Sequence, residues 1–151
     1  MEIRTFRDNE VLTGISILAV LQHTKELSIA KALLIEPILS YTTVIKALNR
    51  ANSKIKSIEE LIIKESIAFS NFSSRYYEKL IMSVNAIILF NKLGLISINN
   101  NVLFFSGQDF DFHDTRLGDR ANARIKAALR LSEILGKGDA SDLYLSLRVE
   151  I

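Results

Sequence analysis

The stretch Ser74 to Phe105, SRYYEKLIMSVNAIILFNKLGLISINNNVLFF, decides the fold of this 151-residue chain. Its first two thirds carry apolar residues at helical spacing on two sides. One stripe comprises Tyr77, Leu80, Ile81, Val84, Ile87 and Ile88, and the second comprises Met82, Ala86, Leu89, Phe90 and Leu93. A helix with two apolar stripes packs on both faces, so we expect this one to lie in the core.

The same stretch predicts the end of that helix and a hairpin directly after it. Gly94 comes just after the last apolar residue, where a left-handed backbone favours glycine. Residues 95–98 and 102–105 have strand character and flank three asparagines, a residue type that tolerates positive φ in tight turns. We therefore expect a winged-helix-like β-hairpin at about residues 95–105, with Asn91 hydrogen-bonded near the helix end.

Helical periodicity continues on both sides of this stretch. The other expected helices cover residues 9–22, 27–41, 42–50, 57–69, 119–136 and 141–147. Pro37 should kink or end the second of them, because proline lacks the amide proton and clashes with the preceding turn. Ser57 and Glu60 have capping-box spacing. The fold class is thus mainly α, one compact domain over residues 1–151, with an extended lead-in at 2–8 and a β-like tail at 148–151.

Composition narrows the class of protein. The apolar fraction is 48% and the mean hydropathy is +0.20, both high for a free-standing domain, which suggests that a protein partner covers some apolar surface. Cysteine is absent, which excludes a disulfide, a thiolate metal ligand and a cysteine nucleophile. The first ten residues are charged and no apolar run reaches the length of a membrane span. We expect a cytoplasmic protein with no membrane segment.

The net charge of +2 is small, but its distribution is uneven. A basic segment near the C-terminus carries Arg116, Arg120, Arg124 and Arg130. These four arginines are candidate contacts for a partner or for phosphate, although a solvated helix face has the same pattern. The expected wing from Ile96 to Phe105 has no Lys or Arg, so it is poorly equipped to bind DNA.

No catalytic constellation is visible. The six glycines are scattered, and the two histidines, His23 and His113, lie apart with no nucleophile motif beside them. One cluster offers metal ligands, namely Asp109, Asp111, His113 and Asp114. The alternative for this segment is an irregular strand that holds Phe110 and Phe112 against the core. We expect no enzyme activity, no cofactor and no bound metal.

Three segments together resemble the middle component of bacterial three-component ABC systems. They are LLIEPIL at 33–39, FSSRYYEKLIMSVNAIILFNKLGLISINNNVLFF at 72–105 and KAALRLSEILGKGDASDLYLSLRVEI at 126–151. The resemblance implies a small non-enzymatic subunit that bridges or regulates an SMC- or Rad50-like ABC ATPase and an effector, often a nuclease. Such sets, including Lamassu-type systems, act against phages and plasmids.

Two other classes of function remain open. A winged-helix transcription regulator would bind duplex DNA by itself, with the arginines of the basic segment on phosphate. An enzyme would use the cluster from Asp109 to Asp114 with a metal ion.

Overall fold

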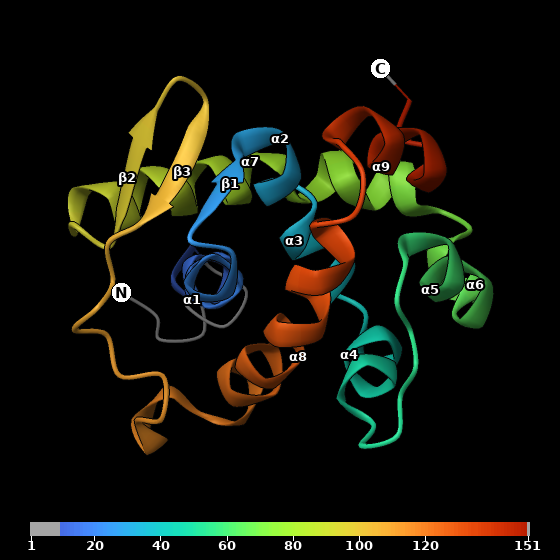
Figure 1. The fold of residues 1–151 in the computed structure, drawn as a ribbon, viewed down its shortest axis with the longest axis horizontal. Coiled ribbons are helices and arrows are strands. Elements are labelled where there is room, and N and C mark those ends of the chain that lie inside the picture. Colours follow the sequence, from blue (N-terminus) through green and yellow to red (C-terminus); the bar gives the residue numbers. More distant parts are fainter. Residues whose placement is uncertain (1–9, 151) are drawn as a thin grey trace.

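A computed structural model describes residues 10–150, so the expected lead-in at 2–8 and the last residue of the tail lie outside the described part. The fold is mainly α, with one small antiparallel sheet (Figure 1). The elements are α1 (Glu10–Thr24), β1 (Glu26–Ser28), α2 (Ile29–Ala32), α3 (Ile35–Leu39), α4 (Thr42–Asn49), α5 (Ile58–Lys64), α6 (Ser66–Phe69), α7 (Phe72–Lys92), β2 (Ile96–Asn99), β3 (Val102–Phe105), the 3₁₀ turn η2 (Thr115–Leu117), α8 (Asp119–Leu135) and α9 (Ala140–Leu147).

Helix α1 is the centre of the core. Every residue from Leu12 to Leu21 is buried, and α1 packs against α7, α8, α3 and the sheet. Figure 1 shows α1 nearly end-on, with α7 running crosswise above it and behind the sheet. Gly14 allows the closest approach in this interface, because a Cβ there would overlap the ring of Phe90 on α7. Glycine is therefore required by packing at this position and not by backbone conformation.

Helix α7 is not the core helix that its two stripes suggested. Its buried residues are Phe72, Tyr76, Ser83, Ala86, Ile87 and Phe90, which form a single face. On the other side Ile81 is 75% exposed, and Leu93 of the second stripe is exposed as well. The prediction of packing on both faces was wrong, because α1 covers one side of α7 and no described element covers the other.

The end of α7 and the hairpin match the expectation closely. Gly94 has φ +78°, and the amides of Gly94 and Leu95 donate to the carbonyls of Asn91 and Phe90, which is a Schellman motif. The Asn91 side chain donates to the Ile96 carbonyl at 2.8 Å. The hairpin turns through Asn100 and Asn101, both at positive φ, as a two-residue type I′ turn requires. The winged-helix-like hairpin after the long helix is therefore confirmed.

The sheet has one strand more than the sequence suggested. Strand β1 pairs with β3, and β3 pairs with β2, so the spatial order is β1-β3-β2 and all pairings are antiparallel. Residues 26–28 were expected to be loop and the start of a helix. Three residues are too few for their periodicity to predict a strand. β1 forms because the edge of β3 in the hairpin is free to pair with it.

Two expected helices are divided. The helix expected over 27–41 breaks after Ala32, before Pro37, which lies within the first turn of α3. Proline is tolerated there because the first amides of a helix have no partner inside it. The helix expected over 57–69 is split by Glu65 into α5 and α6, although Ser57 does cap α5 by accepting from the amide of Glu60.

Residues 148–150 form no strand. They lie against the start of α7, where the amide of Glu150 donates to Ser73 Oγ at 3.0 Å.

Candidate protein-binding surfaces

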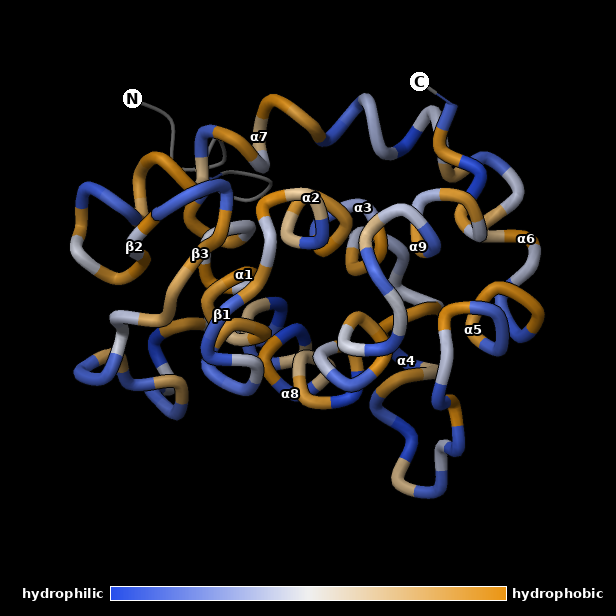
Figure 2. The backbone as a smooth tube through the Cα atoms, turned by 45° about the horizontal axis from the view of Figure 1, so that its top comes forward, coloured by the Kyte–Doolittle hydropathy of each residue, from blue (hydrophilic) through white to orange (hydrophobic). Residues whose placement is uncertain are grey.

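Helix α7 presents an apolar face to solvent, which we call the α7 face. It consists of Tyr77 (47% exposed), Ile81 (75%), Val84 (40%) and Ile88 (46%). These residues succeed one another at intervals of four, three and four, the spacing of a coiled-coil seam. Figure 2 shows α7 along the edge of the molecule, with hydrophobic segments among hydrophilic ones. The α7 face is therefore a strip shaped to receive another helix.

The position of this face argues against DNA as its ligand. Helix α7 leads directly into the hairpin, which is where a DNA-binding winged helix would place the helix that reads the groove. Ile81, Val84 and Ile88 have no group that can bind phosphate, and the Tyr77 hydroxyl donates to the carbonyl of Glu150. Arg75, at one end, is engaged inside the protein, with its guanidinium 4.6 Å from the ring centre of Tyr41 and 3.9 Å from Glu78.

A second surface lies at the opposite end of the molecule from the hairpin. An open groove of about 1320 Å³ runs between α5–α6 and the start of α7, with α9 and the tail on its far side. Its lining mixes serine hydroxyls with apolar side chains. Ile63 borders it, and the neighbouring Ile67 and Leu145 are also strongly exposed. We call Ile63, Ile67 and Leu145 the α5–α9 patch.

A tyrosine pair fastens α7 beside this groove. Tyr144 donates to the carbonyl of Ala30 at 2.6 Å, and the hydroxyls of Tyr76 and Tyr144 are 3.0 Å apart. Because Tyr144 uses its proton on Ala30, Tyr76 is the donor between them. Burial, together with the bond to Tyr76, raises the pKa of Tyr144. The Tyr144 hydroxyl is therefore structural and stays protonated.

The structure separates the four arginines of the basic segment. Arg116 is exposed and pairs with Asp114 at 2.7 Å, and Arg120 is exposed in the first turn of α8. Arg130 is half-buried and donates to the carbonyl of Ser53. Arg124 is buried in the core. The arginines therefore do not form one surface, and Arg124 must be removed from the candidate contacts.

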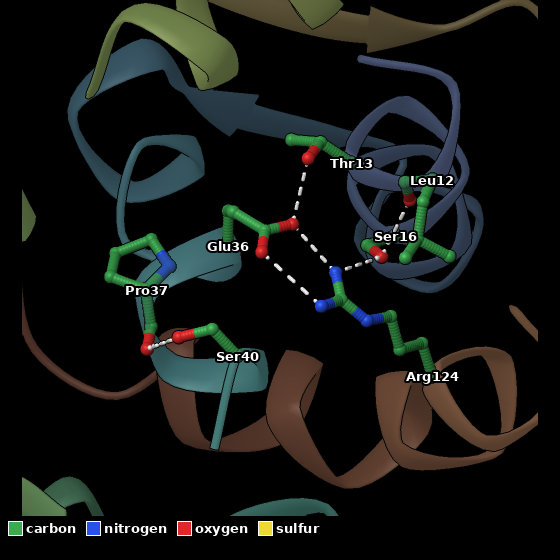
Figure 3. Close-up of polar contacts among 7 residues, drawn as sticks. All are labelled: Leu12, Thr13, Ser16, Glu36, Pro37, Ser40 and Arg124. Atoms are coloured by element: carbon green, nitrogen blue, oxygen red, sulfur yellow. Dashed lines mark hydrogen bonds and ion pairs between the residues drawn. The ribbon is translucent and has the colours of Figure 1, made fainter. Parts of the chain in front are cut away.

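Arg124 belongs to a buried polar network that joins three helices (Figure 3). Its Nη1 and Nη2 lie 2.6 and 3.2 Å from the two carboxylate oxygens of Glu36 on α3. Thr13 and Ser16 of α1 complete the network, with Thr13 donating to Glu36 Oε1 at 2.7 Å and Ser16 Oγ accepting from Arg124. Every member has a partner, so the network fixes how α1, α3 and α8 meet.

Sequence periodicity contained a signal for Arg124. It comes three residues after Ala121 and four before Ala128, so it falls on the buried stripe of α8. Its treatment as a surface contact was wrong, because arginine is rarely buried unless it is paired and no partner was visible nearby. The pairing residue, Glu36, is 88 positions away and cannot be found by spacing.

The acidic loop after the hairpin is held by local bonds. Asp111 accepts from the amide of His113 at 2.9 Å, and Asp114 accepts from the amide and side chain of Arg116. The side-chain and backbone bonds from Arg116 lower the pKa of Asp114 to about 2. Within residues 10–150, no group of three or more His, Cys, Asp or Glu side chains is placed to hold a metal ion.

The aromatic alternative for this loop is correct in its packing. The Phe110 and Phe112 rings meet edge to face, with centres 4.7 Å apart, and both pack against the core. The segment forms turns and no strand. The packing of Phe110 and Phe112 against the core was therefore predicted correctly, and the strand was not.

Comparison of the chain with models of protein families, with characterised proteins and with solved structures found no match. Within the described residues, no helix is long and apolar enough to cross a membrane.

Proposed function

We propose that this chain is a non-enzymatic, cytoplasmic accessory subunit that binds other proteins within a bacterial defence complex. Its partners would be an SMC- or Rad50-like ABC ATPase and an effector such as a nuclease, as the resemblance of its sequence to middle components of three-component ABC systems implies. The subunit would bridge the two or regulate one through the other.

The observation that carries this proposal is the apolar α7 face. The helix that would read DNA in a nucleic-acid-binding winged helix instead presents Tyr77, Ile81, Val84 and Ile88 to solvent. Contiguous exposed apolar side chains of this kind mark contacts with proteins. They also account for the surplus of apolar residues in the composition.

A bridging role requires a second contact surface, and the α5–α9 patch supplies a candidate. Ile63 of α5 lines the groove, and Ile67 and Leu145 are exposed on α6 and α9, whose neighbouring residues line it. Tyr77 belongs to the α7 face and also lines the groove, so the two surfaces adjoin at the start of α7, while Ile63 and Ile67 lie on α5 and α6.

Co-expression with the products of the neighbouring genes, which we expect to include the ATPase and the effector, tests the proposal. We expect the three proteins to co-purify, and we expect the double variant Ile63→Lys/Ile67→Lys to lose at least one of them. Leu129→Lys is the matched control, because Leu129 is an exposed leucine on α8, outside both surfaces.

A chain that co-purifies with neither protein would overturn the proposal. Salt-sensitive binding of duplex DNA by the chain alone, reduced by Arg116→Ala, would support a transcription regulator instead.

A further inference from the structure

We propose that the α7 face is covered by the α7 face of a second copy of this chain, with the two helices antiparallel. This inference rests on the proposed protein-binding function and names the partner of that surface. Each copy keeps its own α5–α9 patch, so the dimer carries two such patches for unlike partners and bridges through them.

The spacing of the α7 face selects a helix as its partner. Residues Tyr77, Ile81, Val84 and Ile88 occupy alternating d and a positions of a heptad repeat. The opposite side of α7 is buried against α1, and Tyr77 donates to the carbonyl of Glu150 in the tail, so the part of the strip open to a partner is Ile81, Val84 and Ile88. A helix that carries the same spacing fits this strip by interlocking side chains.

The polar flank of the strip makes it complementary to itself. Glu78, Asn85 and Lys92 succeed one another at intervals of seven, so all three lie beside the seam at e positions. Each of them is exposed. In an antiparallel pair, equivalent flanks face each other, and the heptad register brings Glu78 of one copy to Lys92 of the other. Asn85 then meets its own counterpart at the two-fold axis.

The same register pairs two apolar residues of the seam. Val84 of each copy packs against Ile88 of the other, on both sides of the axis, and Ile81 lies opposite Asn91, so every contact occurs twice as two-fold symmetry requires. In a parallel pair the e positions of one copy would face the g positions of the other, which are Ser73, Leu80 and Ile87, so Glu78 and Lys92 would meet no opposite charge. The charges therefore favour the antiparallel arrangement.

The expected dimer is weak. A helix of 21 residues is about 31 Å long and 10 Å wide. One such face is smaller than the area of about 800 Å² that each partner contributes to a stable interface. We therefore expect a dissociation constant of the order of 1–100 µM and a mass that depends on concentration.

Sedimentation of the isolated protein, without ATPase or effector, tests the inference. The wild type should change from 17.0 kDa to twice that mass as its concentration rises. Ile88→Glu should raise the dissociation constant about a hundredfold, because both copies lose the contact between Ile88 and Val84. Leu129→Glu, on α8, is the control and should dimerise like the wild type. Circular dichroism checks that each variant is folded.

Two further variants test the antiparallel register. Glu78→Lys should raise the dissociation constant about fivefold, because repulsion replaces two attractions, and Glu78→Lys/Lys92→Glu should restore it. Asn85→Cys places the only cysteine of the chain at the axis and should give a disulfide-linked dimer on oxidation. Leu129→Cys should not.

A wild type that stays monomeric throughout, or equal effects of Ile88→Glu and Leu129→Glu, would overturn the inference. Failure of the charge exchange to restore binding would overturn the antiparallel arrangement. A monomer that still co-purifies with the ATPase would refute the dimer and leave the proposed function standing. A dimer that binds neither ATPase nor effector would refute the proposed function and leave the dimer standing.

Discussion

Arg124 and Glu36, which are 88 positions apart in the sequence, form a bidentate ion pair, and both side chains are at most 5% exposed. Removing water from two charges is costly, and the attraction between them recovers that cost only when the geometry is good and the remaining donors and acceptors are satisfied. Thr13 and Ser16 provide those additional bonds from α1. The pair therefore specifies which turns of α1, α3 and α8 face one another.

Arg124→Ala should lower the free energy of unfolding by about 3–5 kcal/mol, because it leaves the Glu36 carboxylate buried without its partner. Lys126→Ala, on the exposed side of the same helix, should change it by less than about 0.5 kcal/mol. Replacing both charges, in Arg124→Met/Glu36→Met, should recover part of the loss. Urea denaturation measures all three, and equal effects of Arg124→Ala and Lys126→Ala would show that the pair is unimportant.

Gly14→Ala should destabilise the protein by about 1–3 kcal/mol, although alanine favours helices by about 1 kcal/mol over glycine. The reason is overlap of the new methyl group with the ring of Phe90. The penalty should shrink when Phe90→Leu makes room. Thermal or urea unfolding of the two single variants and the double variant measures this coupling, and strict additivity would contradict close contact between α1 and α7 at this point.

The carboxyl group of Asp114 should titrate with a pKa of about 2 in carbon-detected NMR, below its ordinary value of 3.8. Since the folded pKa is depressed, the bonds from Arg116 contribute to stability above about pH 4 and are lost as the pH falls through about 2. Arg116→Ala should move the pKa upward towards 3.8. Lys126→Ala should leave it unchanged, and a pKa insensitive to Arg116 would refute the assigned cause.

Local chemistry made the second half of the fold predictable. Gly94 and the asparagines at 100 and 101 each favour one backbone conformation, and the structure uses these conformations at those positions. The boundaries of α4, α8 and α9 also agree with the apolar spacing, within one or two residues.

The rest depended on contacts between distant segments. β1 forms only because β3 lies beside it, and Arg124 is buried only because Glu36 meets it. Periodicity showed that α7 has apolar sides but not which of them another helix covers. That error is informative, because the uncovered side became the α7 face.

The most direct test of whether the α7 face binds protein is the alkylation rate of a cysteine placed within it. The chain has no native cysteine, so Ile81→Cys and the control Leu129→Cys each carry a single reactive thiol. We predict that the thiol at position 81 becomes protected as the protein concentration rises, that duplex DNA has no effect on it, and that the control thiol reacts at a constant rate. Protection of the thiol at position 81 by duplex DNA, with none at any protein concentration, would contradict a protein-binding role for this face.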